Sequence, residues 1–189
     1  MKNIFKFMGI ALMACSLTMV SCSKDEENET VAEGINVTFD GESWTAAASR
    51  NSYVASYDMI DIFAGKTSIE DFPIFDECIV ASTPAGTYNS TAAENNGAAA
   101  QLDGIHNYVE YYEERALSDG QNSFGDWWAK QATTEITAVD LTALTISAKM
   151  NGTMFSAWEA YTQAGGGVGM DNASTVSYSA TCNIKLTAK

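Results

Sequence analysis

The chain has 189 residues, and its 24 acidic side chains outnumber its 10 basic ones, for a formal net charge of −14. This negative surplus repels phosphate backbones and excludes nucleic acid as a partner. Hydrophobic residues make up 46% of the chain and aromatic residues 11%, which is enough for a packed core and excludes disorder. The length predicts one domain.

Residues 1–21 have the pattern of a secretory signal peptide. Lys2 and Lys6 precede an apolar run over residues 7–20, which is too short to span a bilayer. The run ends in a small residue directly before Cys22, and this resembles the lipobox of bacterial lipoproteins. The resemblance implies cleavage before Cys22 and acylation there, so we expect a lipid anchor in a membrane at this cysteine. The alternative is an ordinary secreted protein cut near the same position.

Residues 22–32 are polar, without an apolar period, and predict a short solvated tether. Ser23 and Lys24 are followed by the acids Asp25, Glu26, Glu27 and Glu29. This order resembles the acidic export signal of Bacteroidetes surface lipoproteins. It implies a lipid-anchored protein on the outer face of the cell outer membrane, whereas a plain linker would leave the protein facing the periplasm.

Residues 33–189 predict a single antiparallel β domain, either a β-sandwich or a calycin-like barrel. Apolar residues alternate with polar ones over residues 35–39, and Asp40-Gly41 then has the composition of a tight hairpin turn. A further strand is expected over residues 53–64. The clearest alternation covers residues 175–186, with every second side chain from Val176 to Leu186 pointing inward.

Three segments leave alternatives open. Residues 105–117 have helical spacing but strand composition, and we favour a strand. Residues 144–158 predict one long strand with a bulge at Gly152, in preference to a hairpin at Asn151-Gly152. Residues 89–104 are small and polar and predict a surface loop.

Several short motifs recur in the same order in small uncharacterised Bacteroidetes surface lipoproteins, which this chain resembles. They are Phe39-Asp40-Gly41-Glu42-Ser43-Trp44-Thr45-Ala46, Ala85-Gly86-Thr87-Tyr88-Asn89, Ile136-Thr137-Ala138-Val139-Asp140 and Leu144-Thr145-Ile146-Ser147. The resemblance implies an antiparallel sandwich or calycin-like barrel and surface lipidation. It brings no established activity and no catalytic residues.

Sequence motifs for catalysis are sparse. His106, the sole histidine, has no recognisable partner motif and is expected in a loop or on the surface. No motif indicates a metal or a cofactor. Cys78 and Cys182 remain after the signal peptide and Cys22 are set aside, and in an exported domain they either form a disulfide or are two separate buried thiols.

Aromatic residues give the best hint of a ligand site. The candidate contacts are Tyr111, Tyr112, Trp127 and Trp128. Neighbours on one strand point to opposite faces, so one of the two tryptophans should be exposed or covered by a loop or partner. Carboxylates stand among the tyrosines, and aromatic faces beside carboxylates suit sugar rings. The alternative is that these aromatics belong to the core.

These observations predict a non-enzymatic outer-membrane surface lipoprotein whose β domain binds an extracellular glycan or protein. One alternative is a structural or accessory subunit of a larger cell-surface complex. A calycin-like barrel with an unfilled interior would instead bind a small apolar ligand. A small hydrolase is the remaining reading, although no catalytic motif supports it.

Overall fold

The computed structural model describes residues 34–93, 101–102, 104–116, 122–162 and 167–189. The chain divides between Thr30 and Val31, and every described residue belongs to the second unit. The signal peptide, Cys22 and the tether therefore lie outside the described residues. Among the residues that are described, no helix has the length and apolar character needed to cross a bilayer.

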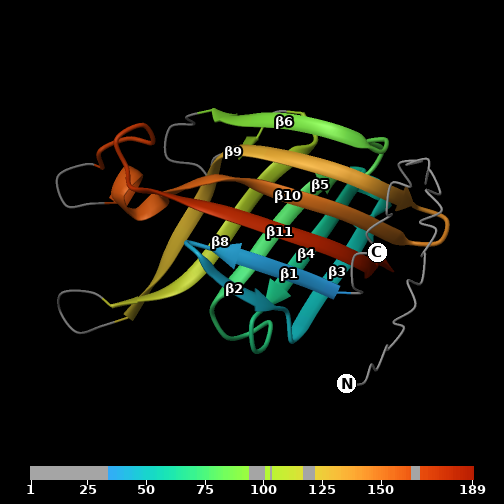
Figure 1. Ribbon diagram of the computed structural model, residues 1–189, viewed down its shortest axis with the longest axis horizontal. Coiled ribbons are helices and arrows are strands. Elements are labelled where there is room, and N and C mark those ends of the chain that lie inside the picture. The colour runs from blue at the N-terminus through green and yellow to red at the C-terminus, as the bar shows by residue number, and fades with distance from the viewer. Residues whose placement is uncertain (1–33, 94–100, 103, 117–121, 163–166) are drawn as a thin grey trace, which may run out of the picture. The chain divides into compact units, whose positions relative to one another are not determined.

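Strands dominate the described chain (Figure 1). They are β1 (Gly34–Phe39), β2 (Glu42–Thr45), β3 (Ala48–Val54), β4 (Met59–Gly65), β5 (Ile74–Val80), β6 (Gly86–Ala93), β7 (Gln101–Leu102), β8 (His106–Ala116), β9 (Asn122–Asp140), β10 (Thr145–Ser156), β11 (Thr175–Lys185) and β12 (Thr187–Ala188). A 3₁₀ turn (Ala55–Tyr57) and a π-helical turn (Trp158–Thr162) interrupt them.

The strands form one curled sheet in the order β12-β3-β4-β5-β8-β9-β10-β11-β1-β2. The first half of β9 pairs with β8 and its second half with β6, on the edge opposite β10. The sheet curls into a half-barrel, which confirms the predicted all-β domain of sandwich or barrel type. It is mixed rather than purely antiparallel, because the short β12 pairs in parallel with β3.

The hairpin between β1 and β2 confirms the first sequence prediction. Asp40 and Gly41 both have positive φ, at 47° and 82°, which is the backbone that a two-residue turn between twisted strands requires. The pairing places Phe39 opposite Glu42 and Val37 opposite Trp44. Alternation along β1 then directs its apolar side chains inward.

Two predicted segments differ from the structure. The expected strand over residues 53–64 is divided between β3 and β4 by the 3₁₀ turn, where Asp58 adopts the left-handed backbone with φ of 51°. Aspartate tolerates this conformation and so reverses the chain. The loop expected over residues 89–104 is strand where the structure describes its two ends, because β6 runs to Ala93 and pairs with β9, and Gln101–Leu102 form β7; residues 94–100 and 103 lie outside the described residues. Of the segment 105–117, residues 106–116 are strand as favoured and form β8, while residue 117 lies outside the described residues.

The long β10 is continuous, as predicted, but the bulge was assigned to the wrong strand. The pairing shifts register next to Thr153, and the extra residue lies on β9, between Ala129 and Gln131. Gly152 has a different role, since a Cβ there would lie 1.9 Å from the carbonyl oxygen of Gln131. The glycine therefore permits a close approach of two backbones.

The core lies inside the curled sheet, where side chains from its two halves meet. The ring of Phe39 on β1 stacks on Tyr111 of β8 with centroids 3.8 Å apart, and Phe75 of β5 lies 6.3 Å from Tyr178 of β11. The inward parity predicted for β11 is confirmed, because Tyr178 and every second residue onward to Leu186 are buried. Figure 1 shows β1 and β11 on the near side, with β3, β4 and β5 behind.

Candidate functional site

Tyr111 and Trp127 pack into the interior. They stand opposite each other on β8 and β9, and Tyr111 is only 5% exposed. Its burial raises the pKa of the phenol to about 12. The indole of Trp127 meets the ring of Phe39 edge-on at 5.6 Å, and its Nε1–H donates to Glu113 Oε1 at 2.7 Å. Both side chains therefore hold the two halves of the sheet together.

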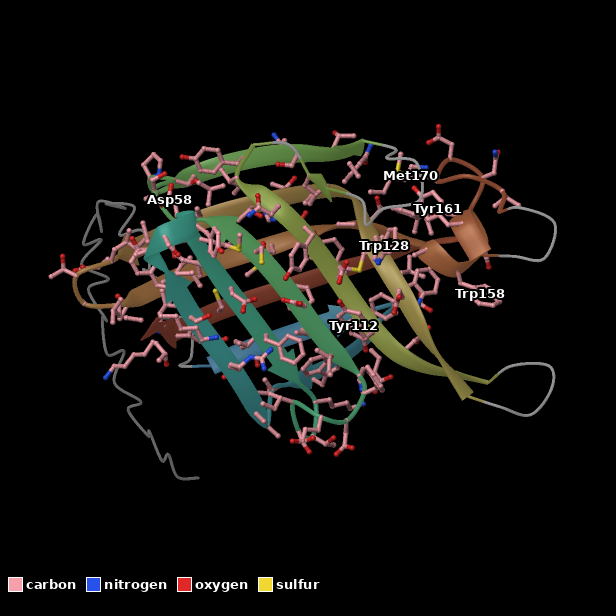
Figure 2. The ribbon with its side chains drawn as sticks, turned by 180° about the vertical axis from the view of Figure 1, so that it is seen from behind. Asp58, Tyr112, Trp128, Trp158, Tyr161 and Met170 are labelled. Atoms are coloured by element: carbon pink, nitrogen blue, oxygen red, sulfur yellow. The ribbon has the colours of Figure 1, made fainter. Side chains whose placement is uncertain are left out.

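Trp128 points to the other face of β9 and is covered by a local turn. Its ring lies 6.1 Å from that of Phe155 and 5.5 Å from that of Tyr161. Tyr161 belongs to the π-helical turn, and Figure 2 shows it beside Trp128. One of the two adjacent tryptophans is thus covered by a chain segment, which is one of the outcomes expected from strand alternation.

Tyr112 is the candidate aromatic that borders a cavity, here called the Tyr112 pocket, on the outer face of the sheet (Figure 2). The pocket has a volume of about 380 Å³. Its lining residues come from β4, the β4–β5 loop, β5, β8 and β9, and they are Phe63, Ile69, Glu70, Phe72, Ile74, Tyr112 and Asp126. Aromatic and aliphatic walls with two carboxyl groups make this the best candidate for a ligand site.

Strand pairing places more carboxyl groups directly beside this pocket. Tyr112 lies between Ile74 and Asp126, and the next row across the same face joins Phe63, Asp76 and Glu110. The hydroxyl of Tyr112 donates to Glu110 Oε2. We call the outward side chains of β4, β5 and β8 the acidic face. Its members are Asp61, Phe63, Ile74, Asp76, Cys78, Tyr108, Glu110 and Tyr112.

The carboxyls of the acidic face are shielded from water. Asp76 is 7% exposed, and its burial, followed by the charges of Asp61 and Glu110, raises its pKa to about 8. Burial also raises the pKa of Glu110 and of Asp126. The Oδ1 atoms of Asp76 and Asp126 are buried without a hydrogen-bond partner. Asp76 therefore holds a proton at neutral pH, and two acceptor atoms beside the pocket are unsatisfied.

His106 lies in the core, so its predicted loop or surface position is wrong. It is 2% exposed, with Nδ1 3.0 Å from Glu77 Oε1 and Nε2 hydrogen-bonded to Thr134 Oγ1. Burial lowers the pKa of His106 to about 4, and burial with the charge of Asp76 raises that of Glu77 to about 8. Both groups are neutral at pH 7, which avoids a buried net charge. Simple alternation would place His106 outward with Tyr108, but the register shift between Cys78 and Ile79 adds a residue to β8 and pairs His106 with the inward Ile79.

Cys78 and Cys182 are free thiols, and of the two alternatives the structure has the buried thiols. Cys78 points to the acidic face, where Sγ lies 3.9 Å from Asp61 Oδ1. Cys182 points into the core, where the charge of Glu77 contributes to its raised pKa. Burial raises the pKa of each thiol to about 12. A bridge is not formed because the two Cβ atoms point to opposite faces of the sheet.

A second outer surface has a different character, and we call it the hydroxyl–amide face. It comprises the outward side chains of β6, β9, β10, β11, β1 and β2. One straight row of paired positions crosses all six strands, through Asn89, Thr133, Asn151, Ser179, Thr38 and Ser43. The pairs at the two ends of the row are hydrogen-bonded, with Thr133 Oγ1 donating to Asn89 Oδ1 at 2.7 Å and the Thr38 and Ser43 hydroxyls 2.8 Å apart. A groove of about 290 Å³ lies between β6, β9 and β10 on this face.

Within the described ranges, no three His, Cys, Asp or Glu side chains are grouped so that they could hold a metal ion. No protein-family model, curated protein or solved structure matches this chain. The resemblance to Bacteroidetes surface lipoproteins therefore stays a prediction from sequence motifs.

Sequence reasoning found Tyr112 but missed the residues that surround it. Asp76 and Glu77 interrupt the apolar run Ile74 to Val80, and an acid in such a run signals a buried carboxyl. Ile69 and Phe72 come from the β4–β5 loop, whose fold over the sheet has no periodic signal in the sequence.

Proposed function

We propose that this chain is a lipid-anchored protein on the surface of the cell outer membrane, and that its β domain binds an extracellular glycan without chemical conversion. Cys22 and the acidic tether support the location. The observation that carries the binding function is the Tyr112 pocket, which joins aromatic walls to a carboxyl oxygen of Asp126 that lacks a hydrogen-bond partner. Its volume of about 380 Å³ is within the range of ligand sites.

Sugar chemistry suits this arrangement. The C–H face of a pyranose ring is apolar and packs on aromatic side chains such as Tyr112 and Phe63, while its hydroxyls donate hydrogen bonds at the edge. Asp126 supplies a buried acceptor at the pocket wall. A few polar groups within an apolar cavity fix the orientation of a ligand, and here those groups are carboxyls.

The other binding functions have less support. In the part of the chain that the structure describes, the large hydrophobic side chains that are exposed are Tyr57 and Val168, which are too few for the apolar patch of a docked subunit. The interior that an apolar ligand would need contains fully buried side chains, among them Phe75, Met150 and Met154.

Two observations support binding without catalysis. The pKa of about 12 keeps the Cys78 thiol protonated and unreactive beside the pocket. The contact between His106 and Thr134 resembles a base and nucleophile, but these residues are 2% and 0% exposed, so a substrate cannot reach them.

The binding function is tested by glycan-array screening followed by calorimetry on the full chain. Tyr112→Ala should weaken binding of any glycan hit about tenfold or more, because it removes an aromatic wall. Tyr57→Ala is the matched control, since Tyr57 is 76% exposed and outside the pocket, and it should bind as the wild type does. Equal affinities of the Tyr112 and wild-type proteins for every hit would contradict the site.

The anchor is tested by cell fractionation. Cys22→Ala should move the protein from the membrane to the soluble fraction, because the acyl chains attach at this thiol. Cys15→Ala, within the signal peptide, is the control and should leave the protein in the membrane. Protease treatment of intact cells then measures surface display. A Cys22 variant that stays in the membrane fraction would refute the lipid anchor.

A further inference from the structure

The charges around the Tyr112 pocket have one sign. Glu70 and Asp126 line the pocket, and the carboxyls of Asp76 and Glu110 stand in the next row of the same face. The pKa of Tyr112 is raised by burial and by three nearby carboxyls, those of Glu110, Asp76 and Asp126. The pocket is therefore surrounded by acceptors, with no basic side chain among its lining residues.

Arg50 is the cation that approaches this region from β3. Its guanidinium lies over the ring of Phe63, 4.8 Å from the centroid. The groups that set the pKa of Asp76 are the carboxyls of Asp61 and Glu110 and the hydroxyl of Tyr108, and Arg50 is not one of them. The arginine therefore does not act as a counter-charge for the carboxyls. Its position does show that the ring of Phe63, in the pocket wall, can bind a cation on its face.

Two buried carboxyl oxygen atoms have no hydrogen-bond donor among the residues that the structure describes. Asp76 is 7% exposed, and its Oδ1 has no hydrogen-bond partner. The same holds for Oδ1 of Asp126, in the wall of the pocket. A buried acceptor without a donor lowers the stability of the fold, so an unmet acceptor in a folded domain calls for an explanation. An ammonium group has three donors, so it can hydrogen-bond to both oxygen atoms, and its positive charge strengthens bonds to carboxyl groups.

We propose that the ligand of the Tyr112 pocket is a glycan with a free, protonated amino group, and that Asp126 and Asp76 accept hydrogen bonds from this ammonium. The inference rests on the glycan-binding function proposed above and adds the class of sugar. The apolar face of the amino sugar packs on Tyr112 and Phe63. N-acetylated and neutral sugars lack the charge and leave the two carboxyl oxygens without a cationic donor.

This arrangement couples binding to proton release. A carboxyl that is protonated in the free protein gives its proton to the buffer when it pairs with the ammonium, and the ligand keeps its own charge. The groups that face Asp76 are Asp61, Tyr108 and Glu110 on the neighbouring strands; Asp61 and Glu110 favour the protonated carboxyl, whereas the hydrogen bond with Tyr108 favours the ionised form. Affinity should therefore rise with pH until the amine of the sugar itself begins to lose its charge.

Calorimetry on the full chain tests the inference with three disaccharides that share one β-1,4 linkage, made of glucosamine, N-acetylglucosamine or glucose. The glucosamine disaccharide should bind at least about tenfold more tightly than the other two. Its apparent enthalpy should differ between two buffers of unequal ionisation enthalpy, which reports proton release. Cyclohexylamine, a cyclic amine without hydroxyls, separates recognition of the charge from recognition of the sugar.

Substitutions place the effect at the pocket. Asp126→Asn and Asp76→Asn should each abolish the preference for the amino sugar, whereas Glu135→Gln removes an equal charge from an exposed site on β9 and should preserve it. If Asp76→Asn does not fold, Asp126→Asn carries the test. A preference unchanged in Asp126→Asn, or shared with Glu135→Gln, overturns the inference.

The remaining outcomes separate the inference from the function on which it rests. Equal binding of the three disaccharides overturns the amino-sugar class and leaves glycan binding in place. Cyclohexylamine binding as tightly as the glucosamine disaccharide supports a cation site and overturns the glycan function. No binding of the glucosamine disaccharide overturns the inference, while the glycan array decides the function independently.

Discussion

The acidic face and the hydroxyl–amide face are outer surfaces of one curled sheet, with the same alternation of side chains, yet they differ in burial. On the hydroxyl–amide face most side chains are short and uncharged, and Asn89 and Asn151 remain exposed. On the acidic face, Asp76 and Glu110 are buried although they point away from the core. Alternation therefore determines which way a side chain points, while the size of its neighbours determines whether water reaches it.

The difference has a physical cause in the neighbouring side chains. Burial among rings and long side chains, from Phe63 through Tyr108 to Tyr112, raises the pKa values of Asp76 and Glu110, although the hydrogen bonds with Tyr108 and Tyr112 act in the opposite direction. Hydroxyls and amides are too small to shield one another, and they bond laterally instead, as Thr45 does to Asn36 at 2.7 Å. A covered polar surface holds unsatisfied groups that a ligand can meet, whereas an open one is already satisfied.

The largest expected effect is a pH dependence of the free energy of unfolding, which is caused by buried acids. The folded-state pKa of Asp76 is raised from 3.8 to about 8, and that of Glu77 from 4.5 to about 8. Above the unfolded values the native state keeps protons that the unfolded chain has lost, so the free energy of unfolding falls as pH rises towards 8. Between pH 6.5 and 8 it should fall by about 3 kcal/mol, and Asp76→Asn should remove about half of that slope.

Urea unfolding at several pH values measures this effect. The window begins at pH 6.5 because His106, with its pKa lowered from 6.5 to about 4, changes stability in the opposite direction only below it. Thr133→Ala, on the hydroxyl–amide face, is the control and should keep the wild-type slope. A slope that Asp76→Asn leaves intact would show that this carboxyl is not protonated in the native state.

Gly152→Ala should destabilise the hydroxyl–amide face by about 2 kcal/mol, the next largest effect. The new Cβ would lie 1.9 Å from the carbonyl oxygen of Gln131, so the β9 backbone must shift. Denaturant midpoints for this variant and for Thr153→Ala, its neighbour on β10, give the comparison. Similar midpoints for the two variants would mean that the β9 backbone can shift at its bulge without lowering the stability of the domain.

Thr133→Ala at neutral pH should have the smallest effect, a loss of about 0.5 kcal/mol. It removes the hydrogen bond to Asn89 Oδ1, but both groups are near water and regain partners there. Thermal melting detects the change as a shift of a few degrees or less. A loss several times larger would show that the row acts as a cooperative network and not as separate hydrated pairs.

Sequence patterns predicted the strands in which one face is apolar and the other polar. The inward parity of β11 and the turn at Asp40-Gly41 followed from period and turn chemistry. The extent of β9 was missed, because its inward residues Ala129, Ala132 and Thr134 are small and do not show an apolar period.

The candidate site was predicted only in part. Tyr112 was named, but the pocket exists because the β4–β5 loop brings Phe72 against β5 and β8, and such tertiary contacts are not encoded in local periodicity. The covered carboxyls follow from the same contacts. The aromatic candidates cannot be ranked by residue type alone either. Tyr111 and Tyr112 are neighbours in the sequence, yet Tyr111 is buried in the core and Tyr112 lines the pocket.

The order of the strands also has a kinetic consequence. Gly34 at the start of β1 pairs with Asn183 of β11, and Ala188 of β12 pairs with Tyr53 of β3. These pairings close loops that include most of the domain, so their entropic cost precedes any gain from packing. Folding should take on the order of milliseconds to seconds, as in other β domains with distant pairings. Until β11 arrives, β1 and β10 each present an unpaired edge, and that interval is when the chain is most exposed to aggregation.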